Sequence, residues 1–149
     1  MITLPPWPVY GEEEREAVER VLLSGKSNYW TGEEGNNFEK EFAAYIGVQH
    51  GACVFNGTVA LELALRSCGV GRGDEVIVTS RSFLASASAV AVVGATPVFA
   101  DVDFTSGNMT CNTIGDVCTA KTKAILIVHI GGWPADMPSI MEFAASKQL

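Results

Sequence analysis

From residue 52 onward, short apolar runs alternate with segments of helical pattern, and this order constrains the fold of the chain more than any other feature. The candidate strands are 52–55, 75–79, 97–100 and 124–128, and the candidate helices are 59–67, 83–93, 113–119 and 136–147. Strands and helices in strict succession favour a parallel sheet with right-handed crossovers. The Val/Ile-rich strands lack polar alternation, which is typical of strands buried on both faces. We therefore predict an α/β fold of three layers, a mostly parallel sheet flanked by helices.

Two amphipathic segments precede this alternating region. Residues 12–23 place apolar side chains on one side and Glu and Arg on the other, and Gly25 follows as a stop signal. Aromatic and aliphatic residues then recur at helical spacing from Phe38 to Ile46, before Gly47. We expect a helical segment over 1–50 and alternating β/α structure over 51–149. No low-complexity linker interrupts the chain, so one domain is predicted over 1–149.

Composition narrows the classes of protein to which the chain can belong. With 48% hydrophobic and 18% charged residues, its 149 residues suffice for a core. The net charge is −7 and no basic block occurs, which disfavours nucleic-acid binding. The first eight residues lack the pattern of a leader, and no apolar run approaches the length of a membrane span. We expect a soluble, cytoplasmic protein that does not bind membranes.

The four cysteines form no CxxC pair and are not spaced with the two histidines as zinc ligands would be. No metal site is therefore predicted from them. Cys53 and Cys68 lie in apolar patterns. We expect both to be buried free thiols of a protein from a reducing compartment.

The turn 56–58, of sequence Asn-Gly-Thr, lies between an apolar segment and a helix-forming run. Free backbone N–H groups at a helix N-terminus, together with the helix dipole, attract an anion such as phosphate. Gly57 suits close backbone approach, and the hydroxyl of Thr58 adds a donor. An ordinary helix cap explains the same residues equally well. At this point both interpretations stay open.

Ligands of open parallel sheets bind beyond the carboxyl ends of the strands, which brings 56–58, 80–83, 101–103 and 129–132 to one edge. There the ring of Phe83 could cover a flat cofactor or pack in the core. His129 could face a site or a buried hydrogen-bond partner. Asp101 and Asp103 have the spacing of paired magnesium ligands, but the polar residues after them favour turn capping.

Several motifs in order resemble the N-terminal part of the DegT/DnrJ/EryC1/StrS family, the pyridoxal-phosphate-dependent aminotransferases that make amino sugars and aminocyclitols. The motifs span essentially the whole chain: 24–26 with 29–32, 38–43, 56–61, 71–78, 94–99, and 128–129 leading to 134–137. The resemblance implies part of the large domain of a fold type I enzyme, preceded by two helices. It also implies a dimer or higher oligomer, a nucleotide-linked keto sugar as substrate, and an amine donor such as glutamate, in amino-sugar and surface polysaccharide biosynthesis.

The resemblance assigns the cofactor, pyridoxal 5′-phosphate, to particular residues. Gly57 and Thr58 would hold its phosphate, and Phe83 would stack on its ring. His129 and the turn that carries Tyr29 and Trp30 would lie in the substrate region, without an assigned role.

The same resemblance places the aspartate that pairs with the ring nitrogen, and the Schiff-base lysine, beyond the stretch that matches Leu149. The five lysines lie in segments that match non-catalytic parts of the family pattern: Lys26, Lys40, Lys121, Lys123 and Lys147. We therefore expect no catalytic residue within the chain and no transamination by the 149 residues alone.

Two other functions stay open beside an aminotransferase segment. One is a non-catalytic α/β module that binds or self-associates through an open sheet edge and exposed apolar faces. The other is a generic binder of small phosphates, which depends on the turn 56–58 alone.

Overall fold

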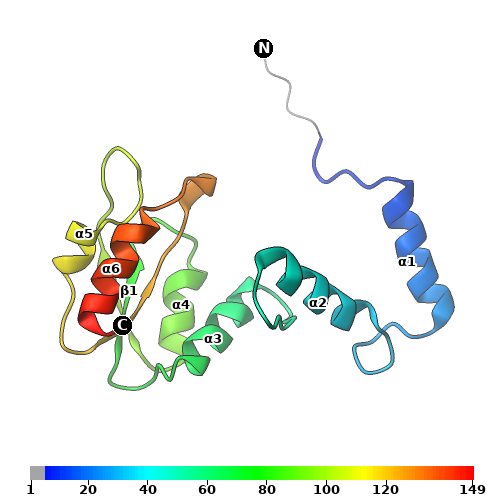
Figure 1. Ribbon diagram of the computed structural model, residues 1–149, viewed down its shortest axis with the longest axis horizontal. Helices are drawn as coiled ribbons and strands as arrows, with labels where there is room; N and C mark the ends of the chain where they lie inside the picture. Colours follow the sequence, from blue (N-terminus) through cyan, green and yellow to red (C-terminus); the bar gives the residue numbers. More distant parts are fainter. Residues whose placement is uncertain (1–5) are drawn as a thin grey trace, which may run out of the picture. The chain divides into compact units, whose positions relative to one another are not determined.

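The computed structural model describes residues 6–149, which form two units, one ending at Cys53 and one beginning at Val54 (Figure 1). No helix within the described range has the length and apolar character needed to cross a membrane. The single domain expected over 1–149 stays a prediction.

The first unit contains two helices, α1 (Glu12–Ser24) and α2 (Glu34–Ile46). Each ends at a glycine in the left-handed region, Gly25 with φ 67° and Gly47 with φ 82°, where a residue with a Cβ would be strained. Both helices were predicted. The second begins before Phe38, because its polar first turn carries no apolar signal.

The second unit confirms the predicted α/β fold. Its elements are α3 (Gly57–Ser67), β1 (Glu75–Thr79), α4 (Ala85–Val92), β2 (Thr96–Ala100), α5 (Cys111–Gly115), β3 (Thr122–Leu126), the 3-10 turn η1 (Ile130–Gly132) and α6 (Met137–Lys147). The strands form a parallel sheet in the order β2-β1-β3. All three carboxyl ends therefore lie at one edge of the sheet, as the parallel order requires.

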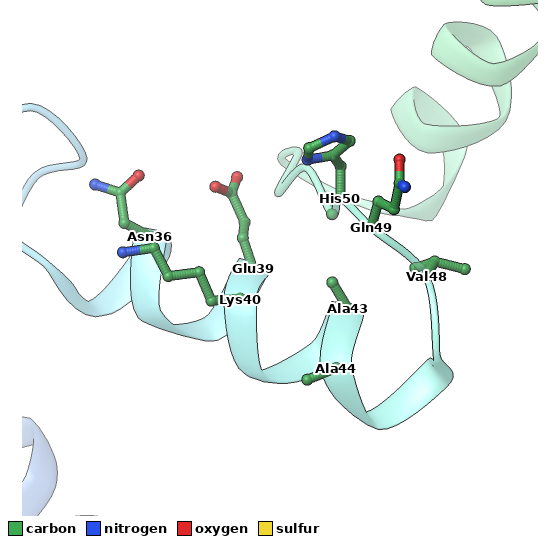
Figure 2. A pocket seen from close by; sticks show the side chains of 9 residues that line it. Asn36, Glu39, Lys40, Ala43, Ala44, Val48, Gln49 and His50 are labelled. Atoms are coloured by element: carbon green, nitrogen blue, oxygen red, sulfur yellow. The ribbon is translucent and has the colours of Figure 1, made fainter.

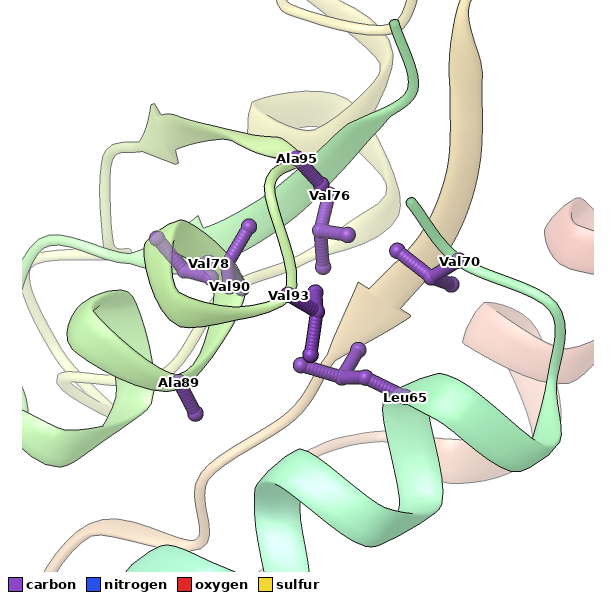
Figure 3. Packing of buried hydrophobic residues seen from close by; sticks show 8 residues of the cluster. All are labelled: Leu65, Val70, Val76, Val78, Ala89, Val90, Val93 and Ala95. Carbon is purple, nitrogen blue, oxygen red and sulfur yellow. The ribbon is translucent and has the colours of Figure 1, made fainter. Parts of the chain in front are cut away.

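Strand β1 is the centre of two hydrophobic clusters, one on each face of the sheet. Val76 and Val78 point into a cluster with Leu65 of α3 and Val90 of α4, which Figure 3 shows. Ile77, between them, points to the other face and packs in a cluster that includes residues of α5 and α6. Successive side chains of a strand alternate between faces, so a strand with a helix layer on each side is apolar throughout.

The predicted strand 52–55 is wrong. These residues have no ladder partner among the described strands, and the N–H of Cys53 instead donates to Glu39 Oε1 at 2.7 Å. The burial expected for Cys53 and Cys68 is also wrong, since both thiols are free but exposed. Cys53 lies in that unpaired connection, and Cys68 is the C-cap residue of α3, so neither is covered by a neighbouring layer.

Two elements begin earlier than expected, one because of capping and one because of strand pairing. Helix α5 begins at Cys111 because the side chain of Thr110 caps it by accepting the N–H of Thr113. Strand β3 begins at Thr122, two residues earlier than predicted, because its first residue pairs with Glu75 of β1.

Truncating Ile77 tests the central place of β1. Its side chain is fully buried, so Ile77→Ala removes about 2–5 kcal/mol from the free energy of unfolding by leaving a cavity. Urea denaturation of the chain measures the change. Phe104→Ala serves as control, since its ring is wholly exposed and its loss changes stability by about 0.5 kcal/mol or less. Equal effects of the two variants would contradict the burial of β1 at the centre of the sheet.

Candidate functional site

The turn 56–58 caps α3 and still leaves donors free. Asn56 has an extended backbone, and its Oδ1 accepts the N–H of Val59 at 3.0 Å. The N–H groups of Gly57 and Thr58, and the Thr58 hydroxyl, make no hydrogen bond to other residues within 6–149. Nothing lies within 4 Å of the position where a Cβ of Gly57 would be. The turn is therefore both a helix cap and an open group of donors at the positive end of an 11-residue helix.

The loop after β1 presents Phe83 to solvent. Its side chain is 79% exposed, so core packing within the second unit is excluded for this ring. Phe83 lies just before α4 rather than inside it, and its carbonyl accepts the N–H of Ser86 at 3.1 Å. The Ser82 and Ser86 hydroxyls are 2.7 Å apart and tie the loop to the first turn of the helix. The first turn of α4 thus fixes the backbone from which the exposed Phe83 ring extends.

His129 follows β3 and is partly committed to backbone structure. Its Nδ1 accepts the N–H of Ala135 at 3.0 Å, which leaves Nε2 as the nitrogen that carries the ring proton. The residue as a whole is exposed. Nε2 therefore remains as a donor for a ligand, while Nδ1 holds the turn that follows.

Asn108, which the sequence pattern did not single out, joins the loops after β2 and β3. Its side chain is 3% exposed, donates through Nδ2 to the Trp133 carbonyl at 3.0 Å and accepts the Ile130 N–H through Oδ1 at 3.3 Å. The N–H of Ser80, after β1, donates to the Ala100 carbonyl at 3.1 Å. The loops at the carboxyl edge are therefore linked to one another. An asparagine in a polar loop carries no sequence signal for this role.

Asp103 caps a turn, as its polar neighbours indicated. Its Oδ1 accepts the Ser106 N–H at 2.8 Å, the Ser106 hydroxyl at 3.0 Å and the Thr105 N–H at 3.1 Å. These bonds, that of the Ser106 N–H foremost, hold the pKa of the Asp103 carboxyl below its ordinary value. Asp101 Oδ1 accepts only the N–H of Val102. Across residues 6–149, no group of three or more His, Cys, Asp or Glu residues is placed to hold a metal ion.

Tyr29 and Trp30 belong to the first unit. The Tyr29 hydroxyl donates to Glu39 Oε2 at 3.1 Å, and this bond raises the pKa of Tyr29. The Trp30 ring packs edge-on against Tyr29 with centroids 5.9 Å apart, and it is 90% exposed. The structure brings these two rings together within their own unit, while Gly57, Thr58, Phe83 and His129 lie in the second.

A pocket of about 360 Å³ in the first unit contains none of the predicted site residues. Figure 2 shows the side chains around it, which come from α2 and the segment that follows: Asn36, Glu39, Lys40, Ala43, Ala44, Val48, Gln49, His50 and Gly51. Its central carboxylate, Glu39, already accepts hydrogen bonds from Tyr29 and Cys53. Glu39 therefore holds the Tyr29 turn, and the pocket is a feature of the first unit.

None of the five lysines lies in a loop that follows a strand. Lys121 and Lys123 flank the first residue of β3, at the opposite edge of the sheet, and Lys147 ends α6. Lys26 and Lys40 belong to the first unit. The carboxyl edge of the sheet in the second unit therefore lacks a lysine amine that could bond covalently to a carbonyl ligand.

Comparison with known proteins matches residues 8–149 to the family model described as the DegT/DnrJ/EryC1/StrS aminotransferase family. A solved aminotransferase from Psychrobacter cryohalolentis is similar, with TM-score 0.95 and 50% identity over 99% of this chain and 37% of that one.

Two curated relatives agree with this match. The 3-amino-5-hydroxybenzoate synthase of Amycolatopsis mediterranei is 42% identical over 95% of the chain and 36% of its own length. A UDP-N-acetyl-3-dehydro-alpha-D-glucosamine 3-aminotransferase of Acidithiobacillus ferrooxidans is 49% identical over 83% of the chain and 33% of its own. The chain spans about a third of the length of these relatives.

The Asp103 turn should make stability depend on pH. Folding lowers the pKa of the Asp103 carboxyl, so the ionised carboxylate stabilises the folded chain. This stabilisation is fully present at pH values above the pKa that Asp103 has in the unfolded chain, and it is lost as the pH falls through the pKa that Asp103 has in the folded chain. Asp103→Asn should therefore be less stable than the natural chain near neutral pH, with the difference shrinking under acid. Urea unfolding between pH 7 and roughly pH 2 measures this. A difference that is constant over this range would show that the carboxylate charge is not what stabilises the turn.

Proposed function

Since the chain belongs to the DegT/DnrJ/EryC1/StrS aminotransferase family, which uses pyridoxal phosphate, we propose that its second unit forms the phosphate-binding and ring-covering part of the cofactor site. Gly57 and Thr58 hold the phosphate and Phe83 covers the ring. The observation that carries this proposal is the open set of donors at the start of α3, in a chain whose family uses a phosphorylated cofactor.

The residues present fit a phosphate group. Two backbone N–H groups and one hydroxyl are free at the N-terminus of α3, and the missing side chain of Gly57 lets an anion approach the backbone. The chain carries a net charge of −7, so its overall field repels an anion. Binding must then depend on short-range hydrogen bonds and the helix dipole.

An exposed ring at the end of β1 fits a flat ligand. Phe83 lies at the carboxyl edge of the sheet, and stacking on a pyridine ring would bury apolar surface that now faces water. The backbone of Phe83 is held by the hydrogen bonds at the start of α4. The ring therefore extends from a fixed backbone position.

Binding and orientation are what these residues supply. Bound pyridoxal phosphate supplies the electron sink for transamination. Proton transfer at the substrate carbon needs a lysine beside the cofactor, and the loops at the carboxyl edge contain none. We propose that the 149 residues alone bind the cofactor without transaminating, and that the lysine comes from outside them.

We further propose that the substrate of the whole enzyme is a nucleotide-linked keto sugar, aminated by a donor such as glutamate in amino-sugar biosynthesis. A relative that is 49% identical is an aminotransferase of a UDP-linked 3-dehydro sugar. Tyr29, Trp30 and the free Nε2 of His129 are proposed to contact the substrate. Four free cysteines agree with action in the reducing cytoplasm.

Binding of pyridoxine 5′-phosphate, which lacks the reactive aldehyde, tests the proposed cofactor residues without interference from surface lysines. Thr58→Val should weaken binding roughly tenfold by removing a hydrogen bond to a charged group. Phe83→Ala should weaken it roughly three- to tenfold through loss of stacking. Equilibrium dialysis read by pyridine absorbance gives both values.

Matched controls for these variants lie in strand β2. Thr96→Val changes a threonine at the amino end of β2, and Phe99→Ala removes a phenylalanine from within that strand. Neither should alter binding. Unchanged affinity in Thr58→Val and Phe83→Ala would refute the assigned roles. Equal affinity for glucose 1-phosphate would favour a generic phosphate cup instead.

A second candidate function, self-association, is favoured by the uncovered side of β3. This strand pairs only with β1 within the described residues. Beside it lies a groove of about 380 Å³ lined mainly by apolar side chains of β3 and α6, among them Ile125, Ile140 and Met141. We propose that a second copy covers this face, because an open strand edge and an apolar groove together favour association.

Size-exclusion chromatography with light scattering tests this second candidate. The chain should elute as a dimer or larger, and Met141→Glu should shift it to monomer by placing a charge in the groove. Phe104→Glu, on an exposed loop residue, should leave the mass unchanged. A monomeric natural chain at high concentration would refute self-association.

A further inference from the structure

Arg81 is a positive charge at the carboxyl edge of the sheet that lacks a counter-ion among the described residues. No other Lys or Arg occurs in the loops 80–84, 101–110 and 127–136, which follow the three strands. The ion pairs found within residues 6–149 join Arg15 to Glu12 and Glu19, and Arg66 to Glu62. Arg81 takes part in none of them, nor does its guanidinium make a hydrogen bond within that range.

The arginine is held by its backbone and by packing. Its N–H donates to the Thr79 hydroxyl oxygen at 3.1 Å, at the end of β1. Its guanidinium then lies over Gly107, in the loop after β2: a Cβ at Gly107 would overlap Nη1 and would lie 3.3 Å from Cζ. The same Cβ would be 3.7 Å from Cγ2 of Ile130, in the turn after β3. Gly107 therefore lies close both to the guanidinium of the loop after β1 and to the turn after β3.

Gly107 is suited to this approach for two reasons. It has φ +68°, where residues with a Cβ are rarely found, and it leaves the space that Nη1 occupies. The neighbouring Asn108 links the same loop to Ile130 and Trp133. The surface against which Arg81 rests is thereby fixed.

The carboxylates of this loop do not neutralise Arg81. Asp103 accepts three hydrogen bonds from its own turn, and Asp101 Oδ1 accepts the N–H of Val102. A guanidinium offers five N–H donors in a planar fork that matches carboxylate and phosphate oxygens. Packing therefore holds the Arg81 guanidinium in place, while its N–H donors have no acceptor among the described residues.

We propose that Arg81 is an oxyanion-binding residue of the substrate part of the site, distinct from the donors at Gly57 and Thr58 that hold the cofactor phosphate. This inference rests on the proposed function. Its ligand is an oxyanion able to accept two parallel N–H bonds. The carboxylate of an amine donor and the diphosphate of a sugar nucleotide both meet this requirement.

Amide-resolved NMR titration of the chain at constant ionic strength tests the proposal, with glutarate as carboxylate probe and uridine diphosphate as phosphate probe. At least one probe should bind and shift the amides of residues 80–82 and of Gly107. Arg81→Gln should weaken that binding about tenfold or more, because a charge-assisted bond is lost. Arg81→Lys keeps the charge without the fork and should be intermediate.

The matched control is Arg72→Gln, an exposed arginine in the loop that leads into β1 at the opposite edge of the sheet. It should bind the probes like the natural chain. If neither probe binds the natural chain, if Arg81→Gln binds as well as it does, or if Arg72→Gln loses as much, the proposal is overturned. The probe whose binding weakens in Arg81→Gln shows whether the oxyanion is the carboxylate of an amine donor or the diphosphate of a sugar nucleotide.

A separate measurement distinguishes this failure from failure of the proposed cofactor site. Pyridoxine 5′-phosphate should bind Arg81→Gln with unchanged affinity, while Thr58→Val should bind that ligand roughly tenfold more weakly and keep its affinity for the oxyanion probe. Loss of pyridoxine 5′-phosphate in Arg81→Gln would show that this arginine serves the cofactor phosphate, and it would overturn the assignment to the substrate.

Discussion

Burial of β1 on both faces is the feature that organises the second unit. Val76, Ile77 and Val78 are wholly buried, and they alternate between two clusters that include residues from all four helices of the unit. A strand covered in this way takes parallel neighbours joined by helical crossovers. Parallel order in turn brings the carboxyl end of every strand to one edge, so the place of the loops that carry Arg81, Phe83 and His129 follows from the packing of the core.

The carboxyl edge is then held together by polar contacts rather than by regular structure. Asn108 bonds two backbone groups of the turn after β3, and the Arg81 guanidinium lies over Gly107 beside Ile130. The Asp103 carboxylate accepts hydrogen bonds from Ser106, in the loop that also carries Gly107 and Asn108. What remains free at this edge and at the start of α3 is a set of donors, which suits anionic ligands in a chain that is itself strongly acidic.

The strands of the sheet could be predicted from the sequence because their apolar runs are short, rich in Val and Ile, and bounded by turns. Residues 52–55 show the limit of that signal, since an apolar run becomes a strand only when a neighbour pairs with it. Phe83 shows a second limit, because hydrophobicity predicts burial and this ring is exposed. The links made by Asn108 and Arg81 depend on residues more than twenty positions away, and no local pattern encodes them.

The free donors of α3 and the ring of Phe83 are proposed to form one part of a cofactor site, and a crystal structure of the chain with pyridoxine 5′-phosphate would reveal whether they do. We expect the phosphate oxygens within hydrogen-bond distance of the N–H groups of Gly57 and Thr58, with the pyridine ring against Phe83. A phosphate bound elsewhere, for example beside Lys121 and Lys123 at the opposite edge of the sheet, would contradict the proposal.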